Sequence, residues 1–235
     1  MALYAIADLH LASSGEKPMD IFGEKWSNHH EKIKDNWLGK ITEEDTVLIA
    51  GDISWSMKME HGIEDLEYIN KLPGKKFFVR GNHDYWWTSI NKLNSMFEGM
   101  KFIQNNFFTY GDYAVCGSRG WILKNNPKFN EHDQKIYDRE LIRLKLSLDT
   151  AVKAGYEKIM VMIHYPPIVP NQLDNEFTQL FEEYGVEKVI YGHLHGWGLA
   201  NVFEGEHNGV EYILTSCDYI HFNPKNYGVI ILSEK

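Results

Sequence analysis

The chain has 235 residues, of which 43% are hydrophobic, and its formal net charge is −9 at pH 7. This length and composition suffice for a domain with a hydrophobic core and exclude an intrinsically disordered chain. The acidic balance argues against general binding to nucleic acid or to an anionic membrane, because such binding depends on Lys and Arg that neutralise phosphates. No stretch approaches the roughly 20 apolar residues of a membrane span, and the apolar run at the start is too short for a signal peptide. We therefore expect a cytoplasmic protein that does not enter membranes.

Short apolar runs that are rich in β-branched and aromatic residues predict buried strands. In chain order these runs are LYAIA (3–7), TVLIA (46–50), KKFFV (75–79), YAVC (113–116), KIMVMI (158–163), KVIY (188–191), EYILTS (211–216) and YGVIIL (227–232). Several of them do not alternate between apolar and polar residues. That pattern is typical of strands that are covered on both faces.

Amphipathic segments between these runs predict helices over residues 28–41 and 131–154. The early order of strand, helix, strand, helix, strand is typical of α/β folds, whereas few helical signals follow residue 188. We expect an α/β fold in which mixed β-sheets pack together with helices outside them, in a single domain of residues 1–235. The apolar positions that indicate the helices are Ile33, Trp37 and Ile41 in the first segment and Tyr137, Leu141, Leu144, Leu148 and Val152 in the second.

Residue types that bind metals follow five of these apolar runs directly. Because ligands bind beyond the carboxyl ends of strands in open α/β sheets, we expect these residues to lie together at one edge. Imidazoles and carboxylates without thiolates suit Mn, Fe or Zn better than Mg or Ca. The donor groups are too many for one catalytic ion and suit two ions about 3.5–4 Å apart that share a carboxylate. The clusters are Asp8 with His10, Gly51 with Asp52, Gly81 to Asp84 (GNHD), His164, and Gly192 with His193 and His195.

The GNHD stretch places an amide, an imidazole and a carboxylate side by side after a predicted strand. Gly81 is expected to permit a tight turn out of that strand. Asn82 offers an uncharged oxygen to a metal, and Asp84 is expected to orient a neighbouring group.

The order of these motifs resembles that of the calcineurin-like metallophosphoesterase superfamily, and the match runs from Asp8 to His195. In chain order the motifs are D-x-H, G-D, G-N-H-D, a single H and G-H-x-H. The resemblance implies a metallophosphoesterase-like sandwich of two β-sheets flanked by helices. His83 does not match a ligand position, and in the family it contacts the phosphate and protonates or stabilises the leaving group. The resemblance implies that Asp8, His10 and His195 bind one metal, that Asn82, His164 and His193 bind the other, and that Asp52 bridges them.

The predicted activity is hydrolysis of a small phosphodiester or monoester by a dinuclear metal centre. Two divalent ions bring four positive charges, and Asp8, Asp52 and a bridging hydroxide remove three, so the centre stays positive and attracts phosphate. Such ions lower the pKa of bound water toward roughly 7, and we expect in-line attack of the bridging hydroxide on phosphorus without a phosphoenzyme. His83, when protonated, would give a proton to the leaving oxygen.

Three other functions are compatible with parts of this pattern. Protein Ser/Thr phosphatases share D-x-H and G-N-H, but they carry an aspartate and an arginine after the second GD and have GNHE; this chain has GDISWSM and GNHD. A nuclease would need a long positive groove, which the acidic composition disfavours. A metal-holding scaffold protein without turnover is disfavoured because every ligand position of the family is kept. The sequence leaves the oligomeric state undefined.

Two further groups of residues receive structural interpretations. Cys116 and Cys217 lie in apolar stretches, which predicts buried free thiols and neither a disulfide nor a thiolate metal site. Trp55, Trp86 and Trp87 follow the metal-binding clusters. Each of these indoles either packs in the core or lines a substrate pocket.

His29 and His30 begin the amphipathic segment at residue 28, and we expect both on its solvated face. Arg119 is expected at the surface, the alternative being a clamp on a phosphate oxygen. Residues 117–155 form the longest connection between predicted strands and are expected as an insertion that partly covers the site like a lid.

Overall fold

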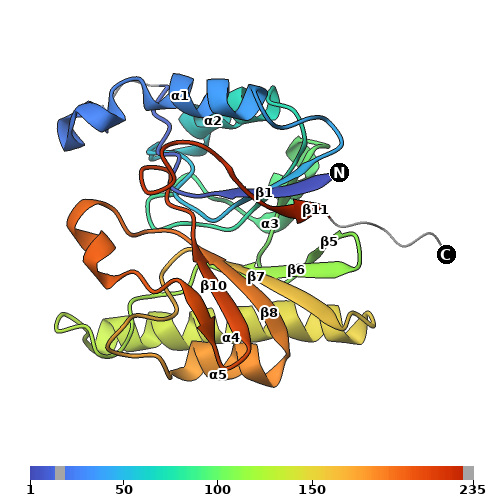
Figure 1. Ribbon diagram of the computed structural model, residues 1–235, viewed down its shortest axis with the longest axis vertical. Helices are drawn as coiled ribbons and strands as arrows, with labels where there is room; N and C mark the ends of the chain where they lie inside the picture. Colours follow the sequence, from blue (N-terminus) through green and yellow to red (C-terminus); the bar gives the residue numbers. More distant parts are fainter. Residues whose placement is uncertain (14–18, 230–235) are drawn as a thin grey trace.

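The computed structural model describes residues 1–13 and 19–229 as two β-sheets packed between two layers of helices (Figure 1). Helices α1 (His29–Leu38) and α2 (Met59–Asn70) cover the first sheet, and α4 (Glu131–Lys153) and α5 (Glu176–Glu183) cover the second. The short helix α3 (Ile90–Met96) contacts strand β4 of the first sheet. This arrangement confirms the predicted α/β sandwich of two mixed sheets flanked by helices.

The first sheet has the strand order β11-β1-β2-β3-β4. Strands β1 (Ala2–Ile6), β2 (Thr46–Ile49), β3 (Lys75–Phe78) and β4 (Met100–Phe102) run parallel, and β11 (Lys225–Val229) runs antiparallel to β1. Helices α1 and α2 connect β1 to β2 and β2 to β3, which is the predicted alternation of strands and helices. The last residues of the predicted strand YGVIIL, 230–232, lie outside the described residues.

The second sheet has the order β5-β6-β7-β8-β10-β9. Its parallel strands are β6 (Tyr113–Ser118), β7 (Lys158–Ile163), β8 (Val186–Tyr191) and β10 (Val210–Leu214), and β5 (Phe108–Tyr110) and β9 (Gly205–His207) add antiparallel edges. The sequence analysis missed β4, β5 and β9, because a strand of three residues is too short to show a pattern. Three 3-10 helices complete the described elements: η1 (Met19–Phe22), η2 (Glu24–Trp26) and η3 (Gly196–Asn201).

Apolar side chains fill the space between the two sheets and the space between each sheet and its helices. Leu48 of the first sheet and Met162 of the second belong to the layer between the sheets, and both are fully buried. Cys116 and Cys217 are buried free thiols that form no disulfide, as predicted. Among the described residues, no helix has the length and apolarity that crossing a membrane requires.

Helix α4 begins at a capping box in which the side chain of Asn130 accepts hydrogen bonds from the backbone of His132 and Asp133. Its buried face includes Tyr137, Leu144 and Leu148, as the apolar spacing predicts, but the last turn buries Ala151 and leaves Val152 exposed. The 3.6-residue period moves the buried position back by one residue over this length.

Residues 117–155 comprise the end of β6, the loop over residues 119–130 and helix α4, which packs against β6. The lid-like role of this segment stays a prediction.

Candidate metal centre

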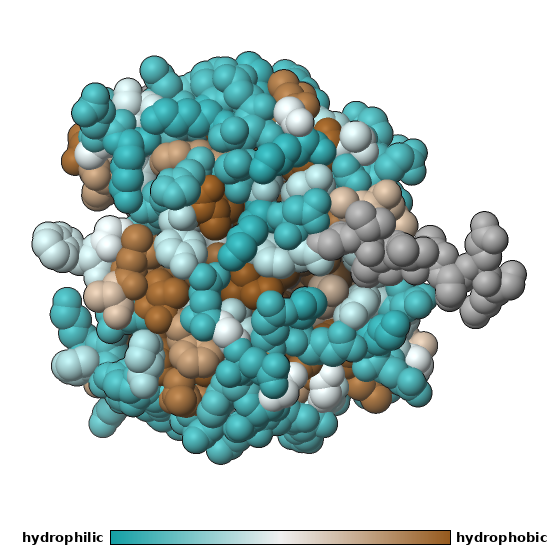
Figure 2. All heavy atoms as spheres, in the orientation of Figure 1, coloured by the Kyte–Doolittle hydropathy of each residue, from teal (hydrophilic) through white to brown (hydrophobic). Residues whose placement is uncertain are grey.

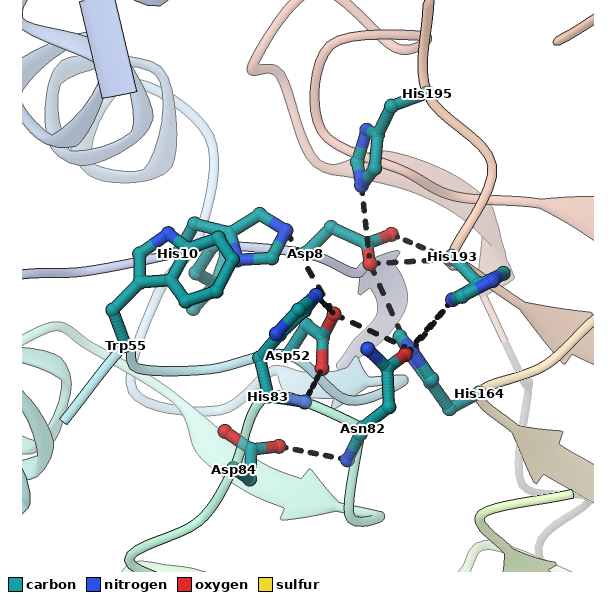
Figure 3. A network of polar contacts seen from close by, with 12 residues as sticks. Asp8, His10, Asp52, Trp55, Asn82, His83, Asp84, His164, His193 and His195 are labelled. Atoms are coloured by element: carbon teal, nitrogen blue, oxygen red, sulfur yellow. Dashed lines mark hydrogen bonds and ion pairs between the residues drawn. The ribbon is translucent and has the colours of Figure 1, made fainter. Parts of the chain in front are cut away.

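The five polar clusters lie together at the carboxyl ends of β1, β2 and β3 in the first sheet and of β7 and β8 in the second. Figure 3 shows that their side chains point toward one another from both sheets. Hydrogen bonds join the sheets at this edge: the backbone N–H of His193 donates to Asp8, and His164 Nδ1 lies 3.0 Å from the carbonyl oxygen of Ala50. The centre therefore depends on the packing of the two sheets against each other.

Several of these residues have a backbone conformation that residues other than glycine rarely adopt. The φ angles of Asp8, His10, Asp52 and His193 are 61°, 44°, 51° and 74°. Left-handed conformations of this kind cost on the order of 1 kcal/mol or more each and cluster at functional sites. Here they turn the chain sharply after β1, β2 and β8, so that the side chains face one common space.

Gly81 is required by the close approach of a neighbouring loop. A Cβ atom at this position would lie 2.1 Å from the backbone nitrogen of Asp52. The φ angle of Gly81 is not positive. A glycine is therefore needed here because of the close contact with Asp52, and not because of the expected freedom to turn.

Asp8, His10 and His195 form the first group of potential ligands, and one ligand atom of each lies within 4.8 Å of the others. His195 Nε2 is 3.3 Å from Asp8 Oδ1. Asp8 is fully buried and His10 is nearly so, while the His195 side chain is 26% exposed. The group is therefore closed toward the core and open on the side of His195.

Asp52, His164 and His193 form the second group, with ligand atoms that also lie within 4.8 Å of one another. Asn82 joins it, because its Oδ1 atom is 2.7 Å from His164 Nε2 and 2.9 Å from His193 Nδ1. Asp52 Oδ2 is 3.4 Å from His164 Nε2 and 3.8 Å from His10 Nε2 of the first group. Asp52 thus lies between the two groups.

His83 lies beside the two groups rather than within either of them. Its Nε2 atom is 4.0 Å from Asp52 Oδ2, and its side chain is 33% exposed. The backbone N–H of His83 donates to Asp52 Oδ1 at 2.8 Å, which fixes the loop that carries it. The imidazole therefore faces the open side of the centre.

Asp84 is fully buried and holds two loops together. Its Oδ1 atom accepts hydrogen bonds from the backbone N–H groups of Ile53 and Ser54, and its Oδ2 atom accepts one from Gly81 at 2.7 Å. The carboxylate therefore orients the backbone on both sides of the centre, where the sequence predicted that it orients a neighbouring group.

The sequence analysis missed Asp218, which supports His195. Asp218 Oδ1 is 2.6 Å from His195 Nδ1, and Lys25 Nζ is 2.5 Å from Asp218 Oδ2. A signal was present, since Asp218 follows the predicted strand EYILTS as the other acidic ligands follow theirs.

The pKa values of Asp8 and Asp52 are shifted in opposite directions. Burial and the nearby charge of Asp8 raise the pKa of Asp52 well above its usual value. Burial would also raise the pKa of Asp8, but His195 and the other imidazoles lower it far below the usual value. Two carboxylates this close oppose each other's ionisation, and a cation between them would remove the repulsion.

The pKa values of the four imidazoles are also shifted in opposite directions. Burial lowers the pKa of His10 and His164, and burial with the neighbouring His164 lowers the pKa of His193 to about 3. Burial would lower the pKa of His195 too, but Asp8 and Asp218 raise it to about 10. Three of the four imidazoles are therefore held neutral, the form in which their nitrogens bind metals.

These donor atoms fit transition metal ions. Ligand atoms that share an ion at about 2.1 Å lie roughly 3.0–3.4 Å apart, because the angles between them are near 90–109°. The separations around Asn82 and His164, from 2.7 to 3.4 Å, are close to this range, and His195 Nε2 makes no hydrogen bond although it lies 3.3 Å from Asp8 Oδ1. A set of imidazole nitrogens and carboxylate and amide oxygens suits Mn, Fe or Zn.

The tryptophans after the clusters have different positions. Trp86 and Trp87 are buried in the core of the first sheet. Trp55 lines a cavity beside the centre, where its ring stacks on His10 with 4.8 Å between the ring centroids.

Two other expectations were wrong. His29 is buried, with Nε2 3.0 Å from the carbonyl oxygen of Leu9, because the loop after β1 covers the start of α1. Arg119 is only 12% exposed and pairs with Glu140, with Nη2 3.3 Å from Oε1. His30 is exposed, as expected.

All four arginines of the chain gather near the buried carboxylate of Glu140. Arg143 Nη1 and Arg139 Nε lie 2.8 and 3.7 Å from the same Oε1 atom that Arg119 contacts. Arg80 lies near these arginines and donates from Nε to the backbone carbonyl of Asp84 at 3.2 Å. Three of the arginines thus neutralise Glu140 of α4, and the fourth holds the GNHD loop.

A family model described as calcineurin-like phosphoesterase matches residues 1–197. No curated protein matches the chain. Solved structures with a similar fold include a phosphopantetheinyl hydrolase, PptH, from Mycobacterium tuberculosis, with 14% identity over 90% of this chain and 87% of that chain, and a TM-score of 0.55. The protein of unknown function AQ665 from Aquifex aeolicus has 16% identity over 96% of this chain and 95% of that chain, and a TM-score of 0.52. TT1561 from Thermus thermophilus has 12% identity over 95% of this chain and 96% of that chain, and a TM-score of 0.53.

Proposed function

Because the chain belongs to the calcineurin-like phosphoesterase family, we propose that it binds two transition metal ions and hydrolyses a small phosphodiester or monoester. Membership of the family supports metal-dependent hydrolysis of phosphoesters in general. The observation that carries the dinuclear centre is the position of Asp52 between two groups of converging ligand atoms.

We assign the ligands to two sites, with Mn, Fe or Zn as the candidate ions. Bound ions supply hydroxide at neutral pH and stabilise charge on the phosphoryl oxygens. Asp52 would serve both sites, since its Oδ2 atom faces His10 on one side and His164 on the other. The first site consists of Asp8, His10 and His195, and the second of Asn82, His164 and His193.

His83 is the candidate catalytic residue of this chain. It lines the cavity beside the ligands and lies near Asp52, so a substrate phosphate in the centre would be within its reach. When protonated, its imidazole would donate a proton to the leaving oxygen, which is the usual contribution of a general acid. Residues that hold its loop, above all Asp84, would fix its direction.

The charges around the centre favour a small substrate over nucleic acid. Among the described residues that line the cavity, Lys25 is the only lysine or arginine, and it pairs with the buried Asp218. A strand of nucleic acid needs several free cations along its path. The Mycobacterium tuberculosis protein is named a phosphopantetheinyl hydrolase, which makes a phosphopantetheinyl ester one substrate to test.

The test is hydrolysis of a chromogenic phosphodiester and the matching monoester by purified protein with added Mn²⁺. Protein stripped with a chelator provides the control. We expect turnover that depends on the metal, and the ratio of the two rates then selects the class of natural substrate. A protein that binds the metal but cleaves neither ester nor a phosphopantetheinyl ester would contradict the proposal and favour a binding role.

A further inference from the structure

A cavity of about 560 Å³ adjoins the candidate centre and has an aromatic wall. One side of the cavity consists of the centre itself, including Asp52, His83 and His195. The other side consists mainly of Phe22, Trp26, Trp55 and Trp197, which come from different loops and 3-10 helices. A phosphoester whose phosphorus lies at the centre would therefore extend one ester group along aromatic rings.

The inner part of the wall contacts the groups of the centre directly. The ring centroid of Trp55 is 4.1 Å from that of His83 and 4.8 Å from that of His10. The ring centroid of Trp26, which is buried, lies 5.5 Å from that of His195. A group that packs against these indoles is thus adjacent to the reacting phosphate.

The outer part of the wall consists of large apolar side chains that are left in solvent. Trp197 is 99% exposed and Phe22 is 59% exposed. They belong to η3 and η1, which project from the same side of the molecule in Figure 1, and Figure 2 shows the surface hollowed between these two segments. Exposed apolar groups that rim a cavity mark binding sites.

The charge of the wall selects against a second anionic group. Lys25, the only lysine or arginine among the described residues that line the cavity, forms an ion pair with Asp218. The arginines of the chain gather at Glu140 instead. Aromatic side chains bind flat rings by offset or edge-to-face packing, for which this wall offers both indoles and a phenyl ring.

We propose that the substrate is a phosphodiester in which one ester group carries an uncharged flat ring, of the aryl or nucleobase kind, and that Phe22 and Trp197 close over this ring. This inference rests on the proposed phosphoesterase function and specifies its substrate class. It makes Phe22 and Trp197 residues that determine specificity.

The test uses S-methyl phosphorothiolate diesters, which release methanethiol and so have a leaving group without a ring, and which differ in the other ester group, which is methyl, hexyl or phenyl. With Mn²⁺ present, we expect kcat/KM to be about tenfold higher for the phenyl ester than for the methyl ester, since a packed aromatic pair contributes on this order. We expect the hexyl ester to fall between them. Equal values for the phenyl and methyl esters, or a higher value for the hexyl ester than for the phenyl ester, would overturn the proposal.

Variants locate the preference in the wall. Trp197→Ala and Phe22→Ala should each reduce the phenyl-to-methyl ratio at least threefold. Ile142→Ala is the matched control, because Ile142 is an apolar residue on the outer helix α4 with a similar exposure of 60%. A ratio that stays at the wild-type value in both variants would show that the ring does not bind here.

A binding measurement separates this proposal from the phosphoesterase function. Metal-dependent hydrolysis of the methyl diester tests the function alone. Calorimetric titration of the Mn²⁺-loaded protein with phenylphosphonate and methylphosphonate tests the wall without turnover. We expect phenylphosphonate to bind about tenfold more tightly; equal affinities would contradict the aromatic site even if the methyl ester is hydrolysed.

Discussion

Asp218 Oδ1 lies 2.6 Å from His195 Nδ1, so the opposite nitrogen of the ring faces Asp8. Carboxylates that contact the second nitrogen of a ligating imidazole fix its tautomer and direction, and their loss typically costs 10–100-fold in metal affinity. Asp218 is far from every motif in the sequence, yet it sets the geometry of one potential ligand.

Asp218→Asn should therefore weaken metal binding about 10–100-fold at one of two sites. Calorimetric titration with Mn²⁺ measures this loss. Asp149→Asn is the control, because Asp149 accepts a hydrogen bond from Tyr184 at 2.5 Å and belongs to none of the groups of potential ligands. An affinity for both ions that equals that of the wild type would show that Asp218 does not position His195.

Asp52→Asn should abolish measurable hydrolysis and lower the affinity for both ions, since Asp52 lies between the two groups of ligand atoms. Metal content after dialysis and the rate with a chromogenic ester are measured together. Asp112→Asn, at an exposed aspartate, provides the control. Full activity of the Asp52 variant would contradict a dinuclear centre.

His83→Ala should keep the bound metal and lose about 10²–10⁴-fold in kcat, the range expected when a general acid is removed. His83 lies beside the ligand groups and outside both of them, which is why the metal should remain. Elemental analysis of the purified variant gives the metal content, and His30→Ala serves as an exposed control. Loss of metal from the His83 variant would make His83 a ligand.

Glu140→Gln should destabilise the protein by about 3 kcal/mol, because it leaves the arginines around Glu140 without their buried counter-charge. Thermal unfolding or urea titration measures the change. Asp138→Asn, at an exposed carboxylate on the same helix, should change stability by less than about 0.5 kcal/mol. Equal effects of the two substitutions would show that the arginines contribute through packing alone.

Lys76 makes the free energy of unfolding depend on pH in the alkaline range. The side chain is buried, and burial lowers its pKa from 10.5 to about 8, although its Nζ donates to the carbonyls of Leu72 and Asn70 at the end of α2. Between these pH values the unfolded chain holds a proton that the folded protein has released. The wild-type free energy of unfolding therefore gains a favourable contribution as the pH rises through this range.

Lys76→Met removes that contribution. The stability of the variant minus that of the wild type should fall by on the order of 2 kcal/mol between pH 7.5 and 10. Urea titrations at both pH values measure it, with Lys75→Met at the exposed neighbour as the control. A difference that is constant with pH would mean that Lys76 has an ordinary pKa.

The sequence predicted the strands that carry the centre because each is a compact apolar run followed at once by polar residues. Asp8 and Asp52 could be placed at one edge because parallel strands of one sheet share their direction. His164 follows a strand of the second sheet, and the packing of the two sheets brings it to the same place. Asp218 was missed although it follows a predicted strand, because only packing brings it to His195. The pairing of Glu140 with Arg119 could not be predicted, because the two residues come from different elements. His29 was placed wrongly for the same reason, since the loop that buries it belongs to another element.

The contacts between the end of β1 and the segment after β10 have a consequence for biosynthesis. Asp8 is held by partners that are made much later: the Cys217 thiol donates to its carbonyl oxygen across 209 residues of sequence, and Ala7 bonds to the backbone of Thr215 and Cys217. At roughly 5–20 residues per second, a ribosome needs on the order of 10–40 s to make that intervening stretch. The nascent chain therefore exposes DLH and GNHD without the segment after β10 that holds Asp8, and the geometry around Asp8 is completed only after Cys217 has been made.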